Sequence, residues 1–222
     1  MDSLIRFFQE GGAFMYPIGI VLIIGIAIAV ERWVVLSTSK SQNRNAFNRI
    51  LPMLVKKDYG AIVNLGKSTD APVARIIASG IARMASSPRR DDIELAMEEG
   101  VMEAMPRLEK RTAYLATLAN IATLLGLLGT IIGLIQAFTA VASADPAEKA
   151  ALLSSSIAVA MNTTAFGLIA AIPLLMAHSM LVSKTTEIID SLEMAGVKCL
   201  NIISHTQDAP RPRSQDAAPA KA

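Results

Sequence analysis

The stretch that decides the fold is residues 112–142, which read TAYLATLANIATLLGLLGTIIGLIQAFTAVA. Small residues recur in this stretch at alternating steps of three and four, namely at Thr112, Ala116, Ala119, Thr123, Gly126, Thr130, Gly133, Ala137 and Ala140. Residues three and four apart lie on one face of a helix. The stretch is therefore predicted to be a long apolar helix with one smooth seam, and in lipid such a seam allows another helix backbone to approach closely.

Composition places the chain among membrane proteins. Of its 222 residues, 52% are hydrophobic and only 18% are charged, and the apolar residues gather into long runs. The net charge of +2 is too small to indicate nucleic-acid binding. A single cysteine, Cys199, excludes an internal disulfide and a cysteine-based zinc site, and two histidines are too few for a metal site without several carboxylates. We therefore expect no metal and no other cofactor, and a soluble metalloenzyme is disfavoured.

Two further apolar runs flank this stretch. Residues 13–30 contain no charge, and residues 152–182 contain none either. Each run is long enough to span a membrane, because about 20 helical residues cross about 30 Å of hydrocarbon. A secretory signal peptide is the alternative for the first run. The residues before it, Asp2, Arg6 and Glu10, are net acidic, whereas a signal peptide begins with positive charge, so a membrane anchor is favoured.

The remaining segments have a soluble character. Amphipathic helices are predicted over 44–57, 59–67 and 71–84, with breaks near Pro52 and Gly60. Another helix begins near Asp91 and is predicted to run without a loop into the 112–142 stretch, with a kink at Pro106. The third run continues as an amphipathic helix to about residue 203. The Pro/Ala-rich end of the chain is predicted to be disordered.

Basic residues predict the orientation of the spans. The segment 32–111 holds 14 of the 21 Lys and Arg residues, whereas the turn at 143–151 holds only Lys149. Because positive residues stay on the cytoplasmic side, both the N-terminus and this turn are expected outside. The predicted order is a periplasmic N-terminus (1–12), transmembrane helix 1 (13–33), a cytoplasmic helical loop (34–111), transmembrane helix 2 (112–142), a periplasmic turn (143–151), transmembrane helix 3 (152–183), a cytoplasmic helix (184–206) and a disordered tail (207–222). The fold class is all-α, with the second and third spans extended into a cytoplasmic helical bundle.

The spans offer hydroxyl groups but no ionisable relay. Residues 112–142 and 152–183 contain no Asp, Glu, Lys or Arg. A membrane threonine commonly bonds back to its own helix or joins two helices, so packing is one interpretation of Thr130 and Thr164. The other interpretation is that they line an ion path. Such a path usually needs an ionisable group, which another polypeptide would have to supply.

Three motifs resemble those of one known family. Residues 124–133, LLGLLGTIIG, are similar to the second-span signature of the MotA/TolQ/ExbB proton-channel family. Residues 160–173, AMNTTAFGLIAAIP, resemble its third span, and GAFMYP at 12–17 with VER at 30–32 resembles its first. The resemblance extends to about residue 203, and three spans with a large inner loop are closer to ExbB and TolQ than to four-span MotA.

The resemblance implies a homopentamer in the bacterial inner membrane, with a periplasmic N-terminus and a cytoplasmic C-terminus. Its second and third spans would surround two copies of an ExbD/TolR-like single-span subunit, whose membrane aspartate carries the proton. Thr130 and Thr164 would be the pore threonines. Thr163 would add a hydroxyl that leaves sodium open as the coupling ion. The small residues expected to pack against the partner helix are Thr123, Gly126, Gly133, Ala137, Ala160 and Gly167. A TonB-like protein would be a further partner if TonB-type import is the process driven.

Two positions depart from the ExbB and TolQ pattern. Val159 stands where the third span carries a glutamate, and Thr123 stands where a proline is common. A structural membrane scaffold without ion flux remains the main alternative. A small-solute transporter is less favoured, because the smooth Gly/Ala seams offer a solute little to bind. An enzyme is least favoured, because the sequence offers no evident nucleophile–base pair.

Overall fold

A computed structural model describes residues 12–207, with side chains through Ser204. Its elements are the helices α2 (Met15–Val55), α3 (Tyr59–Ser68), α4 (Pro72–Ser86), α5 (Arg90–Glu109), α6 (Thr112–Ser143) and α7 (Lys149–Gln207). The all-α prediction is confirmed for these residues. Within them, the segments Met15–Val55, Arg90–Ser143 and Lys149–Ser204 each contain a stretch long and apolar enough to cross a membrane, as predicted. The predicted N-terminal segment 1–12 and the tail 207–222 lie almost wholly outside the described residues.

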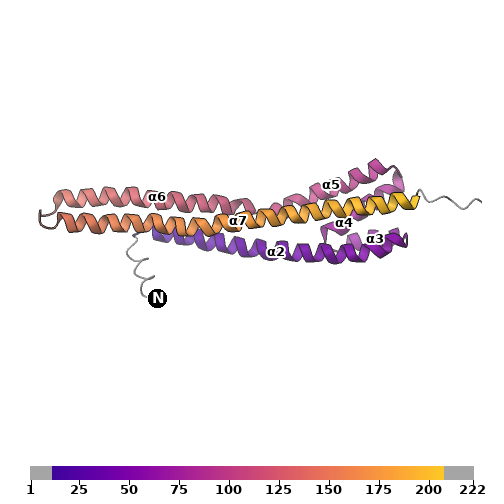
Figure 1. Cartoon of the computed structure of the whole chain (residues 1–222), viewed down its shortest axis with the longest axis horizontal. Helices are drawn as coiled ribbons and strands as arrows, with labels where there is room; N and C mark the ends of the chain where they lie inside the picture. Colours follow the sequence, from indigo (N-terminus) through magenta and orange to yellow (C-terminus); the bar gives the residue numbers. More distant parts are fainter. Residues whose placement is uncertain (1–11, 208–222) are drawn as a thin grey trace, which may run out of the picture. The chain divides into compact units, whose positions relative to one another are not determined.

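The chain divides into two compact units, and the described part of unit 1 comprises residues 12–38 and 106–188. In this unit, α6 and the first half of α7 run antiparallel beside each other, joined by a short turn, and the start of α2 lies alongside α7 (Figure 1). The packing of α2 on α7 is tight, because a Cβ atom added to Gly25 would lie 2.5 Å from Cδ2 of Leu174.

The outer surface of unit 1 is apolar. Large hydrophobic side chains are exposed on all three helices, among them Ile23 (68% exposed), Leu124 (63%) and Met176 (62%). A patch of this kind is rare on a soluble monomer but suits lipid. The surface therefore supports a membrane location for unit 1.

Unit 2 comprises the described residues 39–105 and 189–207 and has a separate core. Its helices are short and begin at defined caps. The Oδ1 atom of Asp58 accepts a hydrogen bond from the backbone N–H of Ala61 at the start of α3, at 3.1 Å. The buried side chain of Asn43 accepts one from the N–H of Val73 in the first turn of α4, at 3.2 Å. The core of the unit includes Ile50, Ile62, Ile77, Ile93, Leu192 and Cys199.

The predicted break near Pro52 is wrong. Helix α2 runs without interruption for 41 residues and contains Pro52 three residues before its end. Proline removes one backbone donor, but so near the C-terminus few later helical bonds depend on it. Ile50 and Leu54 remain buried on either side, which holds this last turn in place. The chain turns instead at Lys57, whose φ of 58° is left-handed.

The prediction of an uninterrupted helix into residue 112 is also wrong. Helix α5 ends at Glu109, and α6 begins at Thr112. Between them Arg111 adopts a left-handed φ of 65°, which is uncommon for a residue with a side chain. The break therefore follows Pro106 by one turn instead of occurring at the proline. Helix α7, by contrast, runs through Pro173 and is 59 residues long. The sequence predicted this continuity from the third span into the helix that follows it.

Candidate functional site

The two threonines predicted as pore residues meet across the α6–α7 pair. Oγ1 of Thr164 lies 3.4 Å from Oγ1 of Thr130 and 2.9 Å from the carbonyl oxygen of Gly126. Oγ1 of Thr130 lies 2.6 Å from the carbonyl oxygen of Leu127 on its own helix. Both threonines are partly exposed. The structure thus brings together two residues that are 34 positions apart in the chain.

The hydrogen-bonding pattern defines what this threonine pair can offer a ligand. Each hydroxyl carries one hydrogen, and a nearby carbonyl oxygen can only accept. The shorter distances indicate that Thr164 donates to Gly126 and that Thr130 donates to Leu127. Both hydrogens are then committed, and the two hydroxyl oxygens face each other with lone pairs available. This arrangement suits a cation, a water molecule or a protonated carboxyl group that donates to them.

Glycines permit the close approach of α6 and α7. A Cβ atom on Gly167 would lie 2.8 Å from the carbonyl oxygen of Ala122 and 3.0 Å from Cα of Gly126. A Cβ atom on Gly133 would lie 3.0 Å from Cβ of Ala160. These four residues of the predicted partner seam (Gly126, Gly133, Ala160 and Gly167) therefore contact one another inside this chain. Their assignment to a partner helix stays a prediction.

The other predicted site residues differ in their surroundings. Thr163 is 2% exposed and its hydroxyl donates to the carbonyl oxygen of Val159 at 3.0 Å. Its methyl group packs against Gly129, where an added Cβ would lie 2.3 Å from Cγ2 of Thr163. Thr123 is exposed and bonds back to Ala119 at 3.1 Å, and Ala137 is buried. Gly129 was missed by the sequence analysis because it lies off the three-and-four stripe.

Val159, noted above as a departure from the ExbB and TolQ pattern, lies close to the backbone of Gly12. A Cβ atom added to Gly12 would lie 3.4 Å from Cγ1 of Val159, an ordinary van der Waals distance. Gly12 has a φ of +75°, so glycine suits this backbone conformation. Near Thr164, α6 supplies the carbonyl oxygen of Gly126 and the hydroxyl oxygen of Thr130, and residues 112–142 and 152–183 contain no carboxylate.

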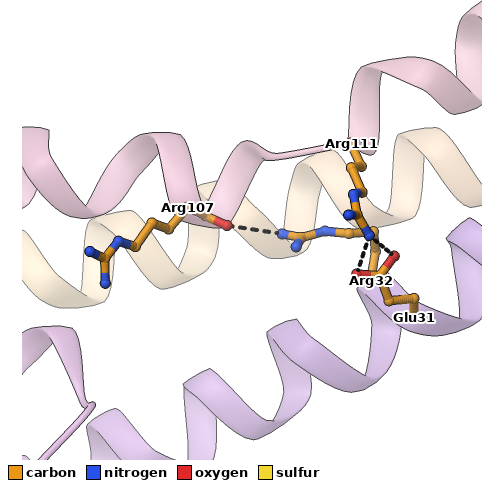
Figure 2. A network of polar contacts seen from close by, with 4 residues as sticks. All are labelled: Glu31, Arg32, Arg107 and Arg111. Carbon is orange, nitrogen blue, oxygen red and sulfur yellow. Dashed lines mark hydrogen bonds and ion pairs between the residues drawn. The ribbon is translucent and has the colours of Figure 1, made fainter.

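A polar network at the α5–α6 break was also missed. The side chain of Arg32 is 3% exposed, and its Nη2 donates to the carbonyl oxygens of Leu108 and of Arg107, the latter at 3.4 Å (Figure 2). Nη1 of Arg111 lies 2.9 Å from both carboxylate oxygens of Glu31. The guanidinium group thus satisfies carbonyls that lose their helical partners where α5 ends. The Glu31–Arg32 pair directly after an apolar run was the available signal.

Lys184 forms a second anchor between α2 and α7. Its Nζ lies 3.8 Å from the ring centroid of Trp33 and 2.5 Å from Oγ of Ser37. A cation–π contact of this kind contributes about 0.5–2 kcal/mol, depending on desolvation. Together with the Arg32 network, this contact ties the three helices of unit 1 together at the end remote from the α6–α7 turn.

Comparisons with known proteins agree on one family. The model of the MotA/TolQ/ExbB proton channel family matches residues 68–194, more than half of the chain. An ExbB-like biopolymer transport protein of Synechocystis sp. is 28% identical over 169 residues, which cover 76% of this chain and 80% of that protein. An ExbB homologue of Methanothermobacter thermautotrophicus is 28% identical over 195 residues, covering 86% of this chain and 67% of that protein. The chain belongs to the MotA/TolQ/ExbB proton channel family.

Proposed function

We propose that this chain is the ion-conducting stator subunit of a motor that uses the proton motive force to do mechanical work at the cell envelope. Membership of a channel and transport-energising family, together with ExbB-like relatives, supports a role related to proton channels and biopolymer transport. Three apolar helices and this membership support a multi-pass protein of the inner membrane. The proposed complex is a homopentamer that surrounds two copies of an ExbD/TolR-like subunit.

The observation that carries the proposal is the pair of threonine oxygens at the α6–α7 contact. Thr130 and Thr164 direct their hydrogens to backbone carbonyls and leave two oxygens 3.4 Å apart. Two acceptors at this spacing can receive the proton of a carboxylic acid or the hydrogens of a hydronium ion. The second and third spans, residues 112–142 and 152–183, contain no acid of their own. A membrane aspartate on a partner helix would supply the group that gains and loses the proton.

The proposed topology places the α6–α7 turn in the periplasm and unit 2 in the cytoplasm. The distribution of basic residues supports this orientation, because 14 of the 21 Lys and Arg lie in the segment 32–111. The N-terminus would be periplasmic and the C-terminus cytoplasmic. A partner helix inside the pentamer would contact Thr123, the exposed residue of the predicted seam.

The test is proton flux through the reconstituted complex of this chain with its single-span partner. Thr130→Val and Thr164→Val keep the side-chain shape but remove the oxygen, so each should abolish flux while the complex still assembles. Thr139→Val is the matched control, because Thr139 is an exposed α6 residue whose hydroxyl bonds back to Ile135 at 2.8 Å. Full flux in both pore variants would refute the assignment.

A structural scaffold is the second candidate, and one observation favours it. The seam residues Gly126, Gly133, Ala160 and Gly167 already contact one another within one chain, as a purely packing role would require. A scaffold predicts a complex without an aspartate-bearing single-span subunit and no ion flux in liposomes. Co-purification followed by flux measurement therefore separates the two functions.

A further inference from the structure

A cleft with several polar side chains in its wall lies at the other end of the α6–α7 pair. A cleft of about 190 Å³ opens where α6 begins and is lined by Glu109, Thr112, Ala113, His178, Val182 and Thr185. It has both a carboxylate and an imidazole in its wall, in contrast to the surroundings of Thr130 and Thr164. This cleft belongs to neither the threonine pair nor the Arg32 network.

Two buried hydroxyl groups in this cleft have no hydrogen-bond partner among the described residues. Thr112 is 4% exposed and Thr185 is 5% exposed, and Oγ1 of each is unpaired. Other threonines of these helices bond back to their own backbone, as Thr123 does to Ala119 at 3.1 Å and Thr186 does to Val182 at 3.2 Å. Buried hydroxyls in native proteins are almost always satisfied, by protein or by water. A cleft of about 190 Å³ has room for water.

The cleft lies in register with the threonine pair. Thr164, His178 and Thr185 are separated by 14 and 7 residues, so they lie near one face of α7, with a drift of about 20° per seven residues. On α6, Thr112, Ala119 and Gly126 follow one another at steps of seven. At about 1.5 Å of rise per residue, Thr185 lies about 32 Å along α7 from Thr164. The paired faces that carry the threonine contact therefore also carry the cleft, about one membrane thickness away.

We propose that this cleft is a hydrated vestibule, the mouth through which protons pass between the threonine pair and the water at the Thr112–Thr185 end of the spans. Water in the cleft would supply the hydrogen-bond partners that the buried hydroxyls of Thr112 and Thr185 lack among the described residues. The imidazole of His178 and the carboxylate of Glu109 lie in its wall. This inference rests on the proposed function and adds a site on the cytoplasmic side of it.

Hydration of the cleft can be tested without measuring flux. In the full complex in inside-out membrane vesicles, with Cys199→Ala as background, Thr185→Cys is treated with a charged, membrane-impermeant methanethiosulfonate, which needs water to react. Leu181→Cys is the control, because Leu181 is only 1% exposed and lies one turn earlier on α7. Thr185→Cys should react at least ten times faster than Leu181→Cys. Equal rates would overturn the proposal.

A flux measurement then tests the role. The double variant Thr112→Val/Thr185→Val should reduce proton flux several-fold in the assembled complex, and Thr185→Ser should retain most of it. Thr117→Val serves as the control on α6, since Thr117 is exposed and its hydroxyl bonds to its own helix. Undiminished flux in the double variant, with flux lost in Thr164→Val, would overturn the vestibule and leave the proposed function standing. Undiminished flux in Thr130→Val and Thr164→Val would refute the proposed function, and the labelling rates would still decide whether the cleft is hydrated.

Discussion

Gly167→Ala is the substitution that tests the α6–α7 contact most directly. The added Cβ would lie 2.8 Å from the carbonyl oxygen of Ala122, whereas ordinary van der Waals contact begins at 3.4 Å. The atom it meets is backbone and cannot rotate away. The helices must therefore separate locally by about 0.6 Å, the difference between these distances. The same displacement would lengthen the 2.9 Å bond from Thr164 to Gly126 to about 3.5 Å, where a hydrogen bond is weak.

The expected cost of this substitution follows from two opposing effects. Overpacking of a tight contact costs about 1–3 kcal/mol, and the higher helix propensity of alanine returns about 1 kcal/mol. Gly196→Ala is the matched control on the same helix, because its Cβ would lie 3.7 Å from Sδ of Met97, an ordinary contact. Both variants share the propensity gain, so the difference between them isolates the packing cost of about 1–3 kcal/mol.

The assay is thermal unfolding of both variants in one detergent, followed by proton flux in the reconstituted complex. Gly167→Ala should unfold several degrees below Gly196→Ala, since 1 kcal/mol shifts the midpoint by about 2–4 °C for a soluble domain of this size. It should also lose flux, because the bond that holds Thr164 to Gly126 is weakened. Equal midpoints and equal flux in the two variants would show that α6 and α7 do not approach as described.

Two other residues give independent predictions. Arg32→Ala should destabilise unit 1 by about 1.5–3 kcal/mol, because a charged donor to buried carbonyls is lost. Arg111→Ala should cost at most about 1 kcal/mol, because its ion pair with Glu31 is half-exposed. Thermal unfolding of both variants measures the two costs, and equal costs would contradict the prediction. Burial raises the pKa of the Cys199 thiol from 9.0 to about 12, so the native protein should react slowly with thiol reagents at pH 8. The free energy of unfolding should fall as the pH rises from 9 towards 12, because the unfolded state releases the thiol proton first. Fast labelling of Cys199 under native conditions would contradict its burial.

Much of the fold could be predicted because its signals are local. Uncharged runs of this length predict membrane spans, and amphipathic periods at 59–67 and 71–84 predicted helices that the structure places at Tyr59–Ser68 and Pro72–Ser86. The errors have a different origin. The break at Arg111 depends on the Arg32 guanidinium, which comes from a helix about 75 residues earlier and satisfies carbonyls at the end of α5. A contact of that separation leaves no periodic trace in the sequence.

The candidate site, like the fold, could be predicted only in part. The small-residue stripe indicated that α6 had a face for close packing, and the resemblance indicated which threonines to pair. The sequence could not show that Gly126 and Gly167 would face each other within one chain. It also could not show which threonine hydroxyls would remain unpaired. Thr185 and Thr186 are adjacent threonines, yet only Thr186 donates a hydrogen bond to its own helix. Thr185 is buried against other elements, and the sequence does not reveal that burial.

The threonine pair and the glycine contact are parts of one arrangement. In α6, the carbonyl oxygen of Gly126 accepts the backbone N–H of Thr130 as its helical bond, and the same oxygen receives the hydroxyl of Thr164. Thr164 can reach that oxygen only because no side chain at 126 or 167 holds the helices apart. The bond then fixes Thr164 beside Thr130 as a consequence of the packing.

This dependence predicts how a channel and a scaffold would respond to the two substitutions. In a channel, Gly167→Ala should lower both stability and flux. Thr164→Val should abolish flux at a cost in stability of only about 0.5–1.5 kcal/mol, because valine keeps the shape of threonine and one hydrogen bond is lost. In a scaffold, the two effects cannot separate, because stability of the helix pair is the only property that either residue supports. A Thr164→Val variant that is stable, assembled and inactive would therefore show that the close packing exists to place an oxygen.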